Sequence, residues 1–317
     1  MVKIARRGRQ EAEALESGDI ISLEHLYLIV TATIVGTLAR ALTIKQDYRQ
    51  YPSHPNGYLI HFVTGALAAA LGAFIIPTLM TKNFVAVTFL SLAIQQFREV
   101  RKIERDSLNE LEGTEYTLRG DSYIDGIAKT FEARNYFALL SAFATGVVME
   151  LLKQTVWLEA PIGAIAGFIV FLILRRFTKG KHIKDFATVR EGRIEVRGSE
   201  LYVDNMLVTN LVGEELARKW FREEGLAAVI TAKKPFYRVT LEHFGQRQAM
   251  LFEATRSVGK RRYAFQDLAE GKIIIALVPI VNNFELLRET ILNTPLLESV
   301  KKSPQLMSMN MTDGDKK

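Results

Sequence analysis

Residues 135–174 read NYFALLSAFATGVVMELLKQTVWLEAPIGAIAGFIVFLIL, an apolar run with very few charges. Its charged side chains are Glu150, Lys153 and Glu159. A second such run covers residues 50–97, where Lys82 is the one charged residue. Runs of this length and composition are typical of helices that cross a membrane.

The charges of the chain collect outside these runs. The 317 residues include 41 basic and 35 acidic side chains, for a net charge of +6. By count along the sequence, the net charge is −1 over residues 1–174 and +7 over residues 175–317. We therefore predict an α-helical polytopic membrane bundle of about five spans, followed by a small soluble α+β domain at the C-terminal end.

The five predicted spans share an uncharged centre and differ in length. They are residues 20–44, 58–80, 83–97, 135–149 and 157–174. The third and fourth offer stretches that rise roughly 22 Å as helices, which is short for a hydrocarbon core of about 30 Å. A re-entrant hairpin over 58–97 is the alternative to two separate spans.

The distribution of lysine and arginine predicts the orientation of the chain. With five spans, fourteen basic residues near span ends fall on the side of the membrane that holds 98–134 and the C-terminal region. Six fall on the side that holds the N-terminal tail. The positive-inside rule then places the former side in the cytosol and the N-terminus outside. The predicted segments are a polar tail at 1–19, a transmembrane domain at 20–174 containing the cytosolic helical segment 98–134, a cytosolic α+β domain at 175–300, and a disordered tail at 301–317.

Beyond the basic residues that follow 174, short runs of alternating polarity predict strands. The predicted strands are 194–197, 201–204, 207–209, 226–232, 236–240 and 272–280, and the predicted helices are 213–224, 241–258 and 283–293. The first three strands form a β-meander, and Asn282 or Asn283 opens the last helix.

Small residues recur in the predicted spans at the spacing of helix-packing motifs. They are Gly163 and Gly167, Ala142 and Gly146, and Gly65, Ala69 and Gly72. Such positions allow helices to approach closely, either within one chain or between two copies in a homo-oligomer.

A candidate interaction site lies on the amphipathic helix predicted to start at Asp121 or Ser122. Its residues are Tyr123, Asp125, Gly126, Lys129, Glu132, Arg134 and Asn135. A charged stripe that enters a span can contact a partner or ligand. The alternative is an ordinary interfacial helix with an Asp125–Lys129 pair four residues apart.

Two further groups of polar residues are candidates for other roles. The intramembrane polar candidates are Arg40, Gln95, Gln96 and Glu150, which line a permeation path or serve as anchors and interhelical hydrogen-bonding groups. The candidates for contact with a lipid surface are Arg175, Arg176, Lys179, Lys181, Lys260, Arg261 and Arg262. A solvated basic turn is the alternative for the last three, and we expect no nucleic-acid partner.

The run Tyr123-Ile124-Asp125-Gly126-Ile127-Ala128 resembles the signature of the YIEGIA-domain membrane proteins, with Asp125 where the family usually has Glu. DYRQYPSHPNGY (47–58), AVTFLSLAIQQFREVRKIER (86–105) and FEARNY (131–136) are also similar to family motifs. The resemblance covers most of 20–260. It implies a polytopic membrane protein of endospore-forming Firmicutes with a link to sporulation and no established chemical activity.

The residue content argues against an enzyme. The chain has no cysteine, which excludes disulfides, thiolate metal sites and a thiol nucleophile, and it contains no phosphate-binding loop, GxSxG or HExxH motif. We expect no catalytic residue, cofactor or metal. The predicted function is a non-enzymatic scaffold or regulator, multi-pass in the cell membrane, which recruits a cytosolic protein partner through its helical loop and α+β domain. The alternatives are a transporter or channel component and, less favoured, an intramembrane enzyme.

Overall fold

The computed structural model describes residues 23–44, 55–82, 84–97, 99–152, 156–178 and 180–301. The predicted tails at 1–19 and 301–317 therefore lie outside the described residues, apart from Lys301. The chain divides into two compact units. We call Met1–Glu104 with Ile127–Lys179 the helical unit, and Arg105–Gly126 with Gly180–Lys317 the mixed unit.

Two continuous helices belong to both units. Helix α6 (Glu99–Glu112) begins in the helical unit and ends in the mixed unit. Helix α7 (Asp121–Leu151) begins in the mixed unit and continues into the helical unit. Residues 105–126, which the sequence grouped with the membrane domain, thus belong with the C-terminal part of the chain.

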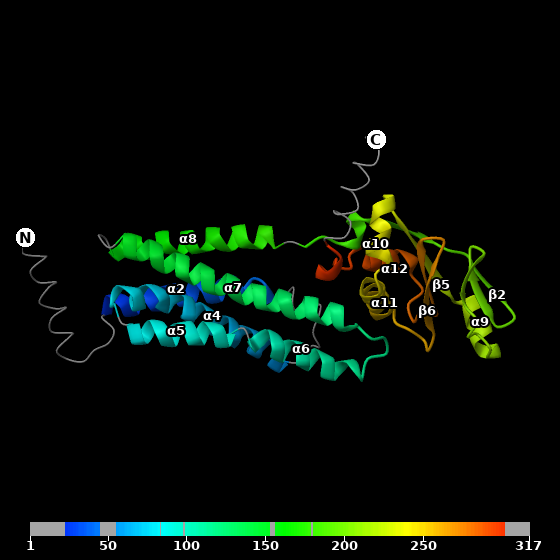
Figure 1. The fold of residues 1–317 in the computed structure, drawn as a ribbon, viewed down its shortest axis with the longest axis horizontal. Coiled ribbons are helices and arrows are strands. Elements are labelled where there is room, and N and C mark those ends of the chain that lie inside the picture. Colours follow the sequence, from blue (N-terminus) through cyan, green and yellow to red (C-terminus); the bar gives the residue numbers. More distant parts are fainter. Residues whose placement is uncertain are drawn as a thin grey trace, which may run out of the picture. The chain divides into compact units, whose positions relative to one another are not determined.

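The helical unit is built from apolar helices that lie lengthwise beside one another (Figure 1). Besides α7 they are α2 (Leu23–Ala41), α4 (Pro55–Met80), α5 (Phe84–Phe97) and α8 (Val156–Phe177). Fully buried alanines form much of their interface, among them Ala32, Ala68, Ala69, Ala73 and Ala138. Such small side chains let helix backbones come close together.

The predicted small-residue positions pack against helices of the same chain. A Cβ at Gly72 would overlap the main-chain carbonyl oxygen of Leu139, and a Cβ at Gly167 would overlap Thr145 Oγ1. One at Gly163 would lie 2.6 Å from Met149 Cγ. These glycines are therefore used in intramolecular packing, and a homo-oligomer stays a prediction.

The prediction of a polytopic bundle with about five spans is wrong. In the described part of the chain, two helices are long and apolar enough to cross a membrane, over Leu59–Met80 and Leu158–Phe177. The apolar helix His25–Ala41 is shorter, and α5 has 14 residues, which rise only about 21 Å. The predicted location of the N-terminus outside the cell depended on the count of five spans, so it has no support once that count is wrong.

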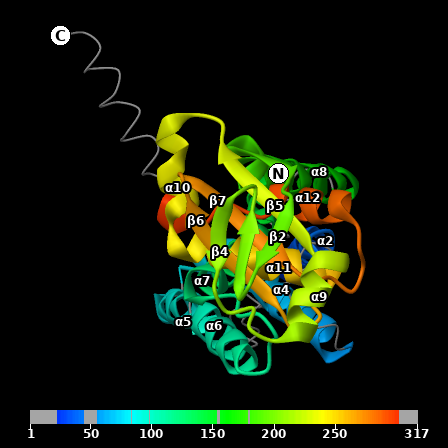
Figure 2. The same cartoon turned by 90° about the vertical axis from the view of Figure 1, so that its right-hand side faces the viewer.

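The larger sheet of the mixed unit has four antiparallel strands in the order β1-β5-β7-β6. The strands are β1 (Ala187–Glu191), β5 (Leu226–Ala232), β7 (Lys272–Leu277) and β6 (Ala264–Ala269). The β5 and β7 residues are almost all buried, as expected for central strands with continuous apolar runs. Figure 2 views this unit from the end at which β2 and α9 lie.

A smaller sheet and four α-helices complete the mixed unit. The antiparallel meander is formed by β2 (Ile194–Arg197), β3 (Glu200–Val203) and β4 (Met206–Thr209), and the helices are α9 (Glu215–Glu223), α10 (Arg238–Glu242), α11 (Phe244–Val258) and α12 (Phe284–Leu292). Three short 3-10 helices cover Ile183–Asp185, Pro235–Tyr237 and Glu298–Val300. Side chains from both sheets and α9 share one apolar core.

Local signals explain which elements of this unit are predictable. Asn283 caps α12, since its Oδ1 accepts a hydrogen bond from the Leu286 N–H at 3.0 Å, which confirms that prediction. The predicted strand at 236–240 is wrong, because the chain forms a 3-10 helix and then α10. Pro235 opens this turn, and its fixed φ suits the first position of a helix.

Candidate functional site

The connection between α6 and α7 is held by charged side chains. Arg119 is almost fully buried, and its Nη2 donates to Glu115 Oε1 at 2.6 Å. Its Nη1 lies 3.5 Å from Glu112 Oε2. Glu112 also accepts from the Gly120 N–H at 2.8 Å. Gly120 has a φ of +83°, which favours glycine, and it turns the chain into α7.

Tyr123, in the first turns of α7, is buried against α11. Its hydroxyl donates to Glu253 Oε1 at 2.5 Å, and its ring meets Phe252 edge-on with the centroids 6.1 Å apart. The Arg119 guanidinium lies 4.7 Å from the centroid of the same Phe252 ring. Burial and then the Glu253 carboxylate raise the pKa of Tyr123 well above its usual value, so the hydroxyl stays a donor near neutral pH.

Further hydrogen bonds attach the loop before α7 to α11 and to the residues after it. Gln248 Nε2 donates to the Leu118 carbonyl oxygen at 2.6 Å. Lys260 Nζ donates to the Tyr116 carbonyl oxygen at 2.5 Å and to Thr117 Oγ1 at 3.2 Å. Desolvation lowers the pKa of Lys260. The loop and the start of α7 are therefore attached to the mixed unit by side-chain hydrogen bonds.

Tyr123→Phe should lower the free energy of unfolding of the mixed unit by about 2 kcal/mol. The substitution leaves the Glu253 carboxylate without this donor, and a hydrogen bond to a charged group contributes about 1.5–3 kcal/mol. Urea titration in detergent, in a Trp157→Phe background so that Trp220 reports alone, measures the change.

The matched control for this substitution is Tyr116→Phe, because Tyr116 is 82% exposed and should change the midpoint little. A Tyr123→Phe midpoint equal to wild type would contradict the assignment. Because the pKa of Tyr123 is raised on folding, the unfolded chain loses this proton first as pH rises above about 10. The stability advantage of wild type over Tyr123→Phe should therefore shrink above that pH.

Gly126 follows Tyr123 by three residues and is not required by packing. A Cβ built on it would meet Leu297 Cδ2 at 3.9 Å, an ordinary van der Waals distance. A glycine inside a helix costs about 0.5–1 kcal/mol relative to alanine. The sequence thus carries a helix-weakening residue where α7 passes from the mixed unit to the helical unit.

Gly126→Ala should raise the unfolding midpoint, by about 0.5–1 kcal/mol in free energy, because alanine favours the helix and has room here. Thermal unfolding followed by circular dichroism measures it. A loss of stability would show that the glycine meets a contact absent from this geometry.

A second polar cluster lies within the helical unit. Arg40, in the last turn of α2, is fully buried. Its Nε donates to Asn135 Oδ1 on α7 at 2.9 Å, and its Nη1 donates to Thr43 Oγ1 at 2.9 Å. The guanidinium carbon lies 5.2 Å from the centroid of the Phe131 ring. Arg40 therefore joins α2 to α7 through a hydrogen bond and a cation–π contact.

Helix α4 closes this cluster from another side. His61 is buried and meets the Phe131 ring edge-on at 4.7 Å between centroids. Gly65 leaves the space that the aliphatic stem of Arg40 occupies, since a Cβ there would overlap Arg40 Cγ. Intramembrane or membrane-edge cations with such dedicated partners are often functional.

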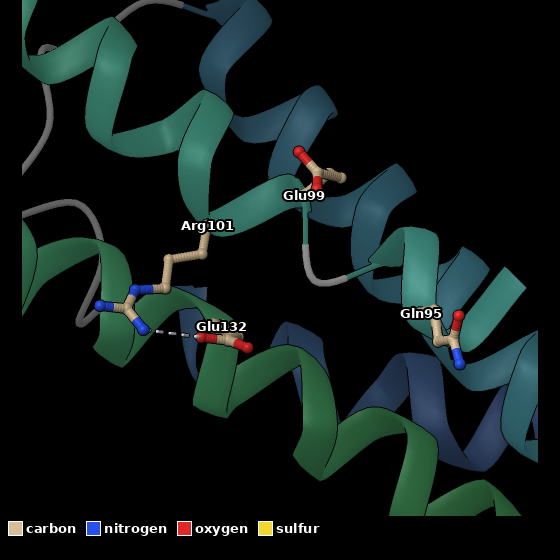
Figure 3. A pocket seen from close by; sticks show the side chains of 4 residues that line it. All are labelled: Gln95, Glu99, Arg101 and Glu132. Atoms are coloured by element: carbon tan, nitrogen blue, oxygen red, sulfur yellow. Dashed lines mark ion pairs between the residues drawn. The ribbon is translucent and has the colours of Figure 1, made fainter. Parts of the chain in front are cut away.

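A pocket of about 360 Å³ is lined by Gln95, Glu99, Arg101 and Glu132 (Figure 3). Figure 3 shows Arg101 of α6 and Glu132 of α7 directed toward each other, and their charged atoms are 4.0 Å apart. Three charged side chains line this pocket beside one amide, so it suits water or a polar ligand. In the described ranges no three His, Asp or Glu residues gather as a metal site.

The structure divides the predicted interaction site between the two units. Tyr123, Asp125 and Gly126 belong to the mixed unit, and the other four residues belong to the helical unit. Arg134 and Asn135 are buried, whereas Asp125, Lys129 and Glu132 are half-buried. Partner binding at these residues stays a prediction.

The other predicted candidates are dispersed. Arg40 belongs to the buried cluster, whereas Gln95 lines the pocket. Glu150 is half-buried, and the side chain of Gln96 lies outside the described residues. Among the lipid-surface candidates, Arg175, Arg176 and Lys181 are exposed, and Lys179 lies outside the described residues.

The basic residues at 260–262 form hydrogen bonds and ion pairs with other residues of the mixed unit. Arg261 forms an ion pair with Glu224 at 2.9 Å, and Arg262 forms one with Glu214 at 3.2 Å. Lys260 bonds to the loop before α7.

Sequence reasoning missed Glu253, Phe252 and Arg119, although it singled out Tyr123. Glu253 is separated from Tyr123 by 130 residues, so no local spacing connects them. The helix predicted at 241–258, which the structure forms as α11 from Phe244 after a break at His243, carries Glu253 in no local pattern that points to Tyr123.

These features define a class: a protein with an apolar helical unit, in which two helices have the length and composition of membrane spans, joined by shared helices to a mixed unit of helices and antiparallel sheets. Residues 28–307 match the family described as "YIEGIA protein", and the chain belongs to that family. It is 33% identical over 290 residues to "Uncharacterized protein YphB" of Bacillus subtilis (strain 168), covering 89% of this chain and 95% of that protein. No solved structure matches.

Proposed function

We propose that the protein is a membrane-bound, non-enzymatic regulator or scaffold that recruits a cytosolic protein during sporulation. The observation that carries this proposal is the continuity of α7, whose first turns pack in the mixed unit and whose remainder packs in the helical unit. Tyr123 and Asn135 are twelve residues apart on this helix, about 18 Å along its axis. A shift of α7 at the Arg40 cluster would therefore be transmitted to Tyr123 and α11.

The division into units supports a specific membrane topology. Residues 105–126 and 180–301 form parts of one compact unit, and a compact unit of this kind would occupy one side of a membrane. Helix α8 can then cross the bilayer only if α7 crosses in the opposite direction. We propose that the apolar last part of α7 crosses the membrane with α8 as a hairpin, although α7 is not one of the two helices whose length and composition alone identify a span. The mixed unit, with its basic residues, then lies in the cytosol.

Single-cysteine labelling tests this topology, because the natural chain contains no cysteine. Glu110→Cys and Arg193→Cys, both exposed in the mixed unit, should react with an impermeant maleimide from the cytosolic side. Gln154→Cys, in the α7–α8 connection, should react from the opposite side. Labelling of all three from one side would overturn the hairpin.

Partner recruitment is tested by crosslinking and pull-down from sporulating cells with the detergent-solubilised protein. The bait variant Asp125→Ala/Lys129→Ala changes the half-buried charged residues of α7. Its matched control is Lys102→Ala/Glu110→Ala, which removes the same charges from exposed positions on α6. A partner captured by wild type and control but lost from the α7 variant supports the proposal. No reproducible partner, or equal capture by all three, counts against it.

The buried Arg40 cluster favours a transporter or channel component as the second candidate function, because polar groups buried among apolar helices often mark a solute path. Proteoliposomes loaded with a fluorescent ion indicator test this candidate. A flux that Arg40→Met abolishes would support it, and tight liposomes would exclude it.

A further inference from the structure

Four lysines gather at one end of the β1–β5 strand pair of the mixed unit, where Ala187 pairs with Ala232. They are Lys181, Lys184, Lys233 and Lys234, and all four are exposed. Lys233 Nζ donates to the Lys184 carbonyl oxygen at 2.5 Å, and Lys184 Nζ donates to Asn293 Oδ1 at 3.4 Å. Both acceptors are neutral oxygens, so these bonds leave the positive charge of the group intact.

A row of three aromatic rings lies between Lys181 and Lys234. Lys181 Nζ lies 5.6 Å from the Phe186 centroid, and Lys234 Nζ lies 5.6 Å from the Phe236 centroid. Tyr237 stands between these rings, 4.8 Å from Phe186 and 4.6 Å from Phe236 between centroids. Phe186 is buried, whereas Phe236 and Tyr237 are half-buried, and half-buried aromatic rings beside lysines suit the polar–apolar boundary of a bilayer.

The covalent chain keeps Lys181 near the end of α8. Helix α8 ends at Phe177, four residues before Lys181, and four residues span at most about 14 Å. Arg175 and Arg176 in the last turn of α8 are exposed as well. Lys181 can therefore come within reach of the negative potential of anionic headgroups around α8, which decays over about 8–10 Å.

We propose that Lys181, Lys184, Lys233 and Lys234 form a docking face by which the mixed unit binds the anionic lipid surface around α8. The inference rests on the proposed membrane location of α8. It assigns the lipid contact to a different group from the triplet at 260–262, whose side chains have partners inside the mixed unit. Each lysine near such a surface strengthens binding about fivefold.

The test uses the full chain in nanodiscs, with an environment-sensitive fluorophore on Pro235→Cys, an exposed position next to Lys234. The discs contain phosphatidylcholine alone or mixed with phosphatidylglycerol, and a headgroup-labelled quencher lipid reports contact. We expect stronger quenching in anionic discs, loss of the difference in about 1 M salt, and a roughly 25-fold weaker docking constant in Lys233→Gln/Lys234→Gln.

Lys219→Gln/Arg222→Gln is the matched control, since it removes two exposed charges from α9 and should dock as wild type does. Equal quenching in neutral and anionic discs, or an unchanged Lys233→Gln/Lys234→Gln variant, would overturn the docking face. So would displacement of the fluorophore from anionic discs by a short RNA at physiological salt, which would identify a nucleic acid as the ligand. Failure of the protein to enter discs at all would instead overturn the membrane location itself.

Discussion

Arg40→Met should lower the free energy of unfolding of the helical unit by about 3 kcal/mol. The substitution keeps much of the side-chain volume but leaves Asn135 Oδ1 and Thr43 Oγ1 without their donor, in a site from which water is excluded. Each buried polar atom that loses its partner costs about 1–3 kcal/mol. Thermal unfolding of the purified protein in detergent, followed by circular dichroism, measures the loss.

Two further variants establish that the loss comes from the cluster. Arg175→Met removes an exposed arginine from the last turn of α8 and should unfold close to wild type. Asn135→Leu combined with Arg40→Met should cost less than the two single losses together, with a coupling energy of about 0.5–3 kcal/mol. Strict additivity of the two substitutions would show that the Arg40–Asn135 hydrogen bond contributes nothing.

Gly72→Ala should destabilise the protein far more than Gly113→Ala, although both replace a glycine by an alanine. Its Cβ would overlap the Leu139 main-chain carbonyl oxygen, which cannot rotate away as a flexible side chain can, so α4 and α7 must separate. Overpacking of this kind costs about 1–3 kcal/mol and sometimes more. We expect a loss near 3 kcal/mol or a protein that fails to purify as a monodisperse species.

Gly113→Ala is the control for this substitution, because a Cβ at Gly113 meets no atom within 4 Å among the described residues. It should change the unfolding midpoint little. If Gly72→Ala behaved like Gly113→Ala, the close approach of α4 and α7 would be disproved.

The sequence predicts best what depends on neighbours along the chain. The Asn283 cap, the β-meander and β5 follow from local polarity and capping chemistry, and the structure forms them. The span count was wrong because an apolar run does not by itself give a helix that is long enough, and free enough of charges, to cross a membrane. Helix α5 is apolar and short, and the last part of α7 is apolar but interrupted upstream by Lys129, Glu132 and Arg134.

The candidate site depends on contacts that no local pattern encodes. Tyr123 could be singled out from its motif, but its partner Glu253 lies on a helix with no unusual composition. Arg40 could be singled out as an isolated cation, but Asn135, its hydrogen-bond partner, is 95 residues away. The strands β1 and β6 were also missed, because their edge positions leave them only partly buried and without strict alternation.

The placement of residues 105–126 in the mixed unit has a consequence for biosynthesis. The ribosome delivers Tyr123 long before Glu253, and at about 5–20 residues per second the intervening 130 residues require on the order of ten seconds. During that interval the apolar face of α7's first turns has no α11 to cover it, although α7 and α8 have already been synthesised. The Tyr123–Glu253 hydrogen bond can therefore form only after every helix of the helical unit has been synthesised.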